Sequence, residues 1–225
     1  MQTAPHQPSF YWETTTTTTT TPPWQVEGIV ETIKRLGCKT VIGSGGGKAI
    51  DTARAAAHLA GLEFVSCPTS ASSDAPCSAL CVVYTPDGKF DHYMLLPRHP
   101  TLVLVDTAVI ARSPKRTLVA GLGDALATWY EARTVAEARS LNFFGGAPSI
   151  TGTALARLCR DVLLADGAEA VAALEAKSVT PALERVVEAS RGAGSFSRPR
   201  ANTLLSGLGF ESGGLCVAHA CHNGG

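Results

Sequence analysis

The chain of 225 residues is long enough to bury a substantial core, as one large domain or two small ones. Its 19 basic and 19 acidic side chains give a formal net charge of zero, so the charge balance favours neither nucleic acid nor an anionic membrane as a partner. Apolar stretches are broken well short of the roughly 18 residues that a membrane span needs. Seven cysteines without a CxxC pair favour reduced thiols. With no signal peptide or Arg-rich leader, these features predict a soluble cytoplasmic protein.

Residues 1–23 are of low complexity. Eight consecutive threonines, Thr14 to Thr21, are followed by Pro22 and Pro23. Such a segment offers no apolar period with which to bury a core, so we predict a disordered tail and assign it no function.

From Trp24 onward, helical and strand patterns alternate. A helical period over 26–37 ends at Gly37, a residue typical of helix C-terminal caps. Residues 39–67 predict a βαβ unit with a parallel sheet, because a glycine turn and an Ala-rich helix join two short buried strands. Further strand patterns predict a hairpin and one more buried strand: residues 79–84, 90–96 and 101–106.

After about Arg112 the pattern is helical. The predicted helices are residues 113–134, 150–167, 168–177, 180–190 and, despite its glycines, 202–225. Residues 191–200 are rich in Gly, Ser, Arg and Pro, and we interpret them as an inserted loop. The predicted fold class is therefore α/β followed by all-α. Its parts are a tail (1–23), a partial nucleotide-binding domain (24–112) and a helical metal and substrate domain (113–225).

A glycine-rich turn in "VIGSGGGKAIDTAR" follows the first predicted strand. Neither a Walker A loop nor a GxGxxG fingerprint fits its spacing, because Ala49 follows Lys48 and lysine stands where the third glycine is needed. The glycines still let backbone N–H groups approach a ligand, and the following helix presents its positive end to an anion. We predict a pyrophosphate site, to which Lys48 adds a charge. The alternative is a tight turn that only permits close packing.

A loop of small polar residues, 68–80, follows the second strand. It lies at the carboxyl edge of the predicted sheet, where α/β proteins bind ligands. Its hydroxyl groups can bond phosphate or ribose, and Asp74 can bond a polyol hydroxyl. Composition alone leaves open whether this is a ligand loop or only a capped loop.

Three residues suggest a metal site. "GLGDALATW" places Asp124 early in a helix, after two glycines that permit close approach, although such an aspartate is often only a favourable charge near the helix dipole. His219 and His222 share one helix face, and imidazole with carboxylate suits Zn²⁺ or Fe²⁺. A local site of Cys216, His219 and Cys221 is disfavoured, because Cys221 would point to another face.

Five stretches in this order resemble the glycerol dehydrogenase branch of the metal-dependent, iron-containing alcohol dehydrogenases, which share the dehydroquinate synthase-like fold. The stretches are "GGGKAIDTAR", "PTSASSDAPCSAL", "GLGDALATWYEAR", "TPALERVVEA" and "LSGLGFESGGLCVAHACHNG". The resemblance implies that Asp74 bonds the substrate and that Asp124 and His219 are two of three protein ligands to a catalytic zinc, with His222 nearby. It also implies a set of NAD contacts: Gly46, Gly47, Lys48, Asp51, Thr69, Ser72, Ser78, Leu80 and Tyr84.

The implied function is oxidation of glycerol to dihydroxyacetone. Zinc, or another divalent metal such as iron, lowers the pKa of the alcohol, and hydride passes to NAD. The implied partner is a small polyol; a homo-oligomer is left open. The alternatives are a related polyol or alcohol dehydrogenase, or a catalytically impaired fragment of this enzyme.

Two departures from the family pattern support the last alternative. The family's third ligand, a histidine, has no counterpart in this chain, and the family's initial βαβ region is replaced by the Thr/Pro-rich segment. We therefore expect a chain incomplete at both ends, with substoichiometric zinc and activity near background.

Overall fold

A computed structural model describes residues 23–85, 87–142, 144–188, 212–214 and 216. Several sequence predictions fall outside these residues: the tail over 1–22, the insert 191–200, the metal-site residues His219 and His222, and Cys221.

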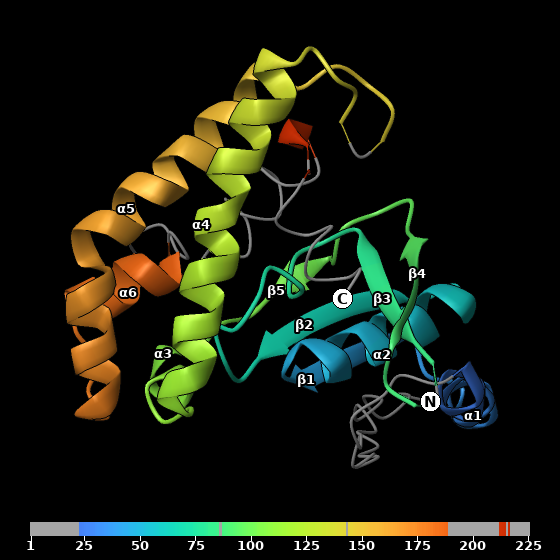
Figure 1. The fold of residues 1–225 in the computed structure, drawn as a ribbon. Helices are drawn as coiled ribbons and strands as arrows, with labels where there is room; N and C mark the ends of the chain where they lie inside the picture. The colour runs from blue at the N-terminus through green and yellow to red at the C-terminus, as the bar shows by residue number, and fades with distance from the viewer. Residues whose placement is uncertain (1–22, 86, 143, 189–211, 215, 217–225) are drawn as a thin grey trace, which may run out of the picture.

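A three-stranded parallel sheet forms the centre of the α/β region (Figure 1). Strand β1 (Thr40–Gly45) pairs with β2 (Glu63–Pro68), and β2 pairs with β5 (Leu102–Val103). Helix α2 (Gly47–Leu59) connects β1 to β2. This arrangement confirms the predicted βαβ unit.

The two faces of this sheet differ. On the face toward α2, Phe64 packs with Ile50 and Ala57 of that helix. On the other face, Ile42, Val65 and Leu102 lie in register across the three strands. Ile42 is 57% exposed and Leu102 is 39% exposed, so this second face presents apolar side chains to solvent.

Helix α1 (Pro23–Leu36) packs beside α2. Its apolar residues recur every three or four positions, so Val26, Val30 and Ile33 face one core cluster with Ala56 of α2. The helix ends as predicted at Gly37, whose φ of 63° lies in the left-handed region.

Strands β3 (Leu80–Tyr84) and β4 (Phe90–Leu95) form the predicted antiparallel hairpin. The predicted strand over 101–106 is shorter than expected, because only Leu102–Val103 pairs with β2. Asp106 instead caps helix α3 (Thr107–Ile110), where its carboxylate accepts hydrogen bonds from the N–H groups of Ala108 and Val109.

Two long helices, α4 (Lys115–Glu137) and α5 (Ile150–Glu175), lie side by side, and α6 (Pro181–Glu188) packs against α5 (Figure 1). The prediction of two helices over 150–167 and 168–177 was wrong. Helix α5 continues through Gly167, because Ala170 and Leu174 beyond it pack into the same core as Leu163 before it. Among the described helices, none has the length and apolar character needed to cross a bilayer.

Candidate functional site

The glycine turn joins β1 to α2. Gly45 has φ +149°, a value that other residues rarely adopt, and a Cβ atom there would lie 2.7 Å from the Cβ of Ala49. Gly46 is the N-cap residue of α2 and has no side chain to accept a hydrogen bond from the first turn. The cap residue therefore offers no side-chain acceptor to the first N–H groups of α2, whereas a Ser or Asp cap would. This end of the helix is suited to binding an anion.

The polar loop lies against this turn. The N–H of Thr69 donates to the carbonyl oxygen of Gly45 at 2.9 Å. Farther along the loop, the hydroxyl oxygen of Ser73 would lie 3.3 Å from a Cβ atom placed on Gly47. The structure thus brings together the two segments for which the sequence predicted phosphate and ribose contacts.

Three other predicted nucleotide contacts lie around the turn: Lys48, Tyr84 and Ser72. The ammonium nitrogen of Lys48 lies 4.8 Å from the ring centre of Tyr84, so the helix start meets the hairpin. Burial, followed by the charge of Asp51, raises the pKa of the Tyr84 hydroxyl. The hydroxyl groups of Ser70 and Ser72 lie 3.3 Å apart on the loop.

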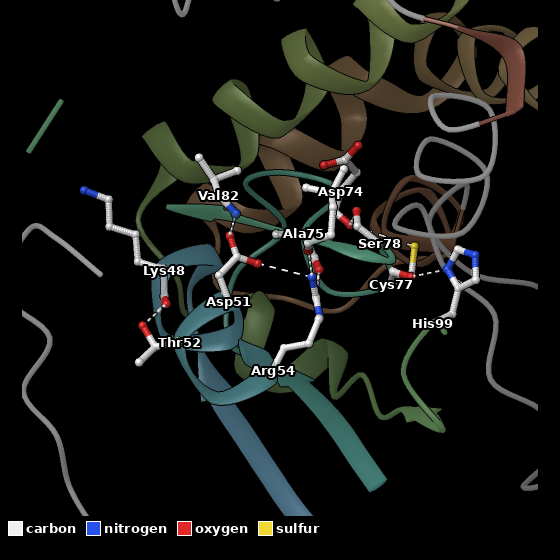
Figure 2. Close-up of polar contacts among 11 residues, drawn as sticks. Lys48, Asp51, Thr52, Arg54, Asp74, Ala75, Cys77, Ser78, Val82 and His99 are labelled. Carbon is white, nitrogen blue, oxygen red and sulfur yellow. Dashed lines mark hydrogen bonds and ion pairs between the residues drawn. The ribbon is translucent and has the colours of Figure 1, made fainter. Parts of the chain in front are cut away.

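Asp51, also predicted as a nucleotide contact, is only 4% exposed. Its carboxylate accepts a hydrogen bond from the N–H of Val82 at 3.1 Å and pairs with the guanidinium of Arg54 at 3.2 Å (Figure 2). Burial raises the pKa of Asp51 to about 6, although Arg54 and the Val82 N–H both act to lower it. In this structure the carboxylate therefore ties α2 to β3.

Ser78 and Leu80, two more predicted contacts, are buried. The Ser78 hydroxyl donates to the carbonyl oxygen of Asp74 at 3.1 Å, and the carbonyl oxygen of Leu80 accepts a hydrogen bond from Arg54. Both residues therefore use these polar groups to hold the loop and the hairpin in place.

The polar loop also meets α4. The backbone N–H of Asp74 donates to Oδ2 of Asp124 at 3.3 Å. The predicted substrate residue and the predicted metal ligand therefore lie together, although fifty positions separate them in the chain.

One glycine of α4 permits this contact. A Cβ atom on Gly121 would lie 2.0 Å from the carbonyl oxygen of Ala71, whereas a Cβ atom on Gly123 would meet nothing within 4 Å among the described residues. The expectation that Asp124 lies early in its helix was wrong, because α4 starts at Lys115 and Asp124 lies in its third turn.

Cys159 of α5 lies close to both carboxylates. Burial, and then the negative charges of Asp124 and Asp74, raise the pKa of the Cys159 thiol to about 12. The thiol, which lies within reach of the carbonyl oxygen of Ala125 at 3.9 Å, is therefore neutral at ordinary pH.

The donor chemistry of Asp124 fits the predicted metal, because carboxylate oxygen is a ligand that Zn²⁺ and Fe²⁺ accept. Within the part of the chain that the structure describes, no three His, Cys, Asp or Glu side chains are grouped so as to hold a metal ion. His219, the second predicted ligand, lies outside that part.

Glu131 was not anticipated from the sequence. It is 2% exposed and lies about two turns beyond Asp124 on α4, where its carboxylate accepts a hydrogen bond from the N–H of Cys216 at 3.1 Å. Residue 216 therefore lies against the helix that carries Asp124. The spacing of 124 and 131 indicates only that the two acids share one face of α4, and no local pattern links Glu131 to residue 216.

Arg54 and His99 were also missed. Arg54 stands three positions after Asp51, a helical spacing that suggests an ion pair. His99 lies beyond the hairpin, and its Nδ1 is 2.8 Å from the carbonyl oxygen of Cys77 (Figure 2). No local pattern in the sequence links His99 to the polar loop.

Comparison with known proteins shows which proteins share this fold. The model of the family "Iron-containing alcohol dehydrogenase" matches residues 9–114. The chain is 50% identical to glycerol dehydrogenase from Escherichia coli O6:H1 over 200 residues, which are 89% of this chain and 50% of that protein. Over the residues that these matches cover, the chain is a homologue of proteins of the iron-containing alcohol dehydrogenase family.

Within this family, similarity is strong to glycerol dehydrogenases. The crystal structure of a probable glycerol dehydrogenase from Sinorhizobium meliloti 1021 is 43% identical, with a TM-score of 0.82 over 91% of this chain and 54% of that one. A glycolaldehyde reductase from Halobacterium salinarum is 46% identical over 89% of this chain and 52% of its own length. These matches confirm the predicted fold class and the resemblance. The chain spans about half the length of the curated relatives that it matches.

Proposed function

We propose that this site serves the NAD-dependent and zinc-dependent oxidation of glycerol to dihydroxyacetone. The observation that carries the proposal is the hydrogen bond between Asp74 and Asp124, formed beside the glycine turn. It brings a predicted substrate residue and a predicted metal ligand to one place. The similarity to glycerol dehydrogenases supports the same chemistry.

The glycine turn and the polar loop would bind the cofactor. The N–H groups after Gly46 and Gly47 face the pyrophosphate, and Lys48 adds a positive charge. Hydroxyl groups of Thr69 and Ser72 bond phosphate or ribose oxygens. These contacts hold the nicotinamide against the carbon that gives up hydride.

Asp74 and Asp124 would act on the alcohol. The Asp74 carboxylate bonds a hydroxyl of the polyol, while its own N–H keeps Asp124 in position. Asp124 and His219 would hold the zinc ion, which when bound supplies the Lewis acidity that lowers the pKa of a substrate hydroxyl.

Two other functions are each favoured by one observation. Similarity to a glycolaldehyde reductase favours a small hydroxy-aldehyde as an alternative substrate. Coverage of about half of each relative favours nucleotide binding without turnover.

Separate measurements of binding and turnover on the purified chain distinguish these functions. We expect NAD⁺ binding by titration calorimetry and, because activity near background is expected of this chain, only slow NADH formation that depends on glycerol. The variants Asp74→Asn and Asp124→Asn are expected to remove this glycerol-dependent NADH formation. Asp161→Asn, which changes an acid on α5 whose side chain is 49% exposed, serves as the control.

The outcomes are distinct. NADH consumption that is faster with glycolaldehyde than with dihydroxyacetone would move the substrate to the hydroxy-aldehyde. NAD⁺ binding without NADH formation supports the binding function. No NAD⁺ binding by a folded chain overturns the proposal.

A further inference from the structure

Arg54 lies at the centre of a buried polar cluster that the proposed function does not use. Arg54 lies in the second turn of α2 and is 2% exposed. Its guanidinium lies 5.5 Å from the ring centre of Phe64. A buried charge is tolerated only when it is paired and hydrogen-bonded. The contacts of its two terminal nitrogens therefore define a fixed arrangement around it, while its Nε is buried without a hydrogen-bond partner in the described part of the chain.

Three segments meet at this guanidinium. One terminal nitrogen, Nη1, donates to the carboxylate of Asp51 on α2 and to the carbonyl oxygen of Leu80 on β3. The other, Nη2, donates to the carbonyl oxygen of Ala75 in the polar loop (Figure 2). A planar group with several N–H donors can bridge carbonyls from two segments in this way, whereas the single ammonium of a lysine cannot match that geometry.

The bond to Ala75 acts next to Asp74. The carbonyl oxygen of Asp74 accepts hydrogen bonds from the N–H of Cys77 and the hydroxyl of Ser78. On the other side, the N–H of Asp74 donates to Asp124. The backbone of Asp74 is thus held between α4 and the part of the loop that Arg54 anchors.

We propose that Arg54 is a positioning residue, which fixes the loop carrying Asp74 to the helix whose N-terminus binds the nucleotide. This inference rests on the proposed function for its effect on the reaction, but the loop position itself can be measured without turnover. Arg54 contacts neither substrate nor cofactor in this scheme. It acts through the backbone at Ala75 and Leu80.

A purely structural role is the alternative to separate. Breaking a buried ion pair destabilises the whole fold, because it leaves a charge without a partner. Local release of the loop would instead expose the loop and leave the core of α4–α6 intact. Two buried cysteines report on these regions: Cys77 in the loop, 2% exposed, and Cys159 in the helical core, 0% exposed.

The test is site-resolved thiol labelling of the full chain, followed by mass spectrometry of the individual peptides. In Arg54→Met we expect Cys77 to be labelled about tenfold faster or more, with the rate at Cys159 unchanged. Arg54→Lys keeps the positive charge beside Asp51. In this variant we expect Cys77 to be labelled as fast as in Arg54→Met. Arg185→Met, which removes a surface guanidinium from α6, is the matched control and should leave both rates unchanged.

Steady-state kinetics give the second reading. The loosened loop should raise KM for glycerol about tenfold in Arg54→Lys, with a smaller change in the Kd for NAD⁺. If the chain binds NAD⁺ but does not turn over, the proposed catalysis fails and the labelling result still decides the position of the loop.

Three outcomes would overturn the inference. Equal acceleration at Cys77 and Cys159 in both Arg54 variants would show a global effect. Unchanged labelling of Cys77 in both variants would show that Arg54 does not hold the loop. Full restoration of slow labelling by Arg54→Lys would show that charge alone is sufficient and that the bridge between carbonyls is not needed.

Discussion

The α/β region and the helical region are held together by different forces. In the α/β region, buried polar groups such as Asp51, Arg54 and Ser78 fix irregular backbone between α2, the loop and the hairpin. In the helical region, the cluster that joins α4, α5 and α6 is apolar, and it includes Leu118 and Leu183. Apolar packing is roughly proportional to buried area and tolerates substitution of similar volume, whereas each buried hydrogen bond needs one particular partner.

The proposed site lies where these two regions meet. Asp74 is held by polar bonds of the α/β region, and Asp124 is carried on a helix that apolar packing positions. This difference predicts that substitutions in the helical core mainly lower the free energy of unfolding. Substitutions around the polar loop should mainly change the geometry of the proposed site and the dependence of stability on pH.

The largest effect is expected at the helical core. Leu183→Ala removes a side chain that is 0% exposed and should lower the free energy of unfolding by about 3–5 kcal/mol. Leu164→Ala, on the solvent side of α5 at 67% exposed, should change it by less than about 0.5 kcal/mol. Urea denaturation of both variants gives the two values, and equal losses would contradict the packing.

The contact between the two regions is tested by a pair of glycines. Gly121→Ala places a Cβ atom against the carbonyl oxygen of Ala71 and should cost about 1–3 kcal/mol as the loop is pushed from α4. Gly123→Ala meets open space among the described residues and should stabilise the helix by about 0.5–1 kcal/mol. Thermal denaturation measures both, and a destabilising Gly123→Ala would show that α4 packs differently.

The buried carboxylate of Asp51 predicts a pH response. Its pKa is raised from 3.8 to about 6 in the folded chain, where Arg54, Cys81 and Tyr84 surround it. Between pH 4 and 6 the unfolded chain releases this proton and the folded chain keeps it, so the contribution of Asp51 to stability falls as pH rises. The fall should be on the order of 2 kcal/mol.

Comparison with Asp51→Asn isolates this effect. The variant cannot titrate at position 51, so its stability should depend less on pH across the same window. Urea denaturation at several pH values measures both slopes, and identical slopes would show that Asp51 is ionised in the folded chain throughout.

The smallest effect is expected at the surface of the helical region. Arg185 of α6 donates two hydrogen bonds to Asp166 of α5, which lowers the pKa of that carboxyl. A carboxyl whose pKa is lower in the folded chain than in the unfolded chain stabilises the fold at pH values above its unfolded pKa. This stabilisation is lost as the pH falls through the folded pKa. Asp166→Asn should lower Tm by about 1–3 °C at neutral pH, and less at pH 3. A shift that is larger at pH 3 would contradict the assigned sign.

Local sequence signals predicted much of the fold. The glycine cap at Gly37, the strand–turn–helix pattern over 39–67 and the hairpin are each encoded by neighbouring residues, and the structure contains all three. Gly167 shows the limit, because packing of α5 on both sides of it overrides its tendency to end a helix.

The site was predictable in part. Residues of the turn and the loop could be picked out because both follow parallel strands, which end at one edge of the sheet. The depth of Asp124 in α4 was not recognised, although Pro114 at the N-cap marks the helix start. Three contacts depend on tertiary approach, which no local pattern encodes: the hydrogen bond from Val82 to Asp51, the closeness of Gly121 to Ala71 and the contact between His99 and Cys77.

The sheet face that carries Ile42, Val65 and Leu102 has a practical consequence. Apolar side chains exposed in register across neighbouring strands attract other copies of the same surface, and β1 is an edge strand of the sheet that the described residues form. Self-association of the purified chain through this face should therefore limit its yield and shelf life, even in conditions where the fold itself is stable. A single polar replacement at Ile42 would raise the concentration at which the chain can be handled, without touching any residue of the proposed site.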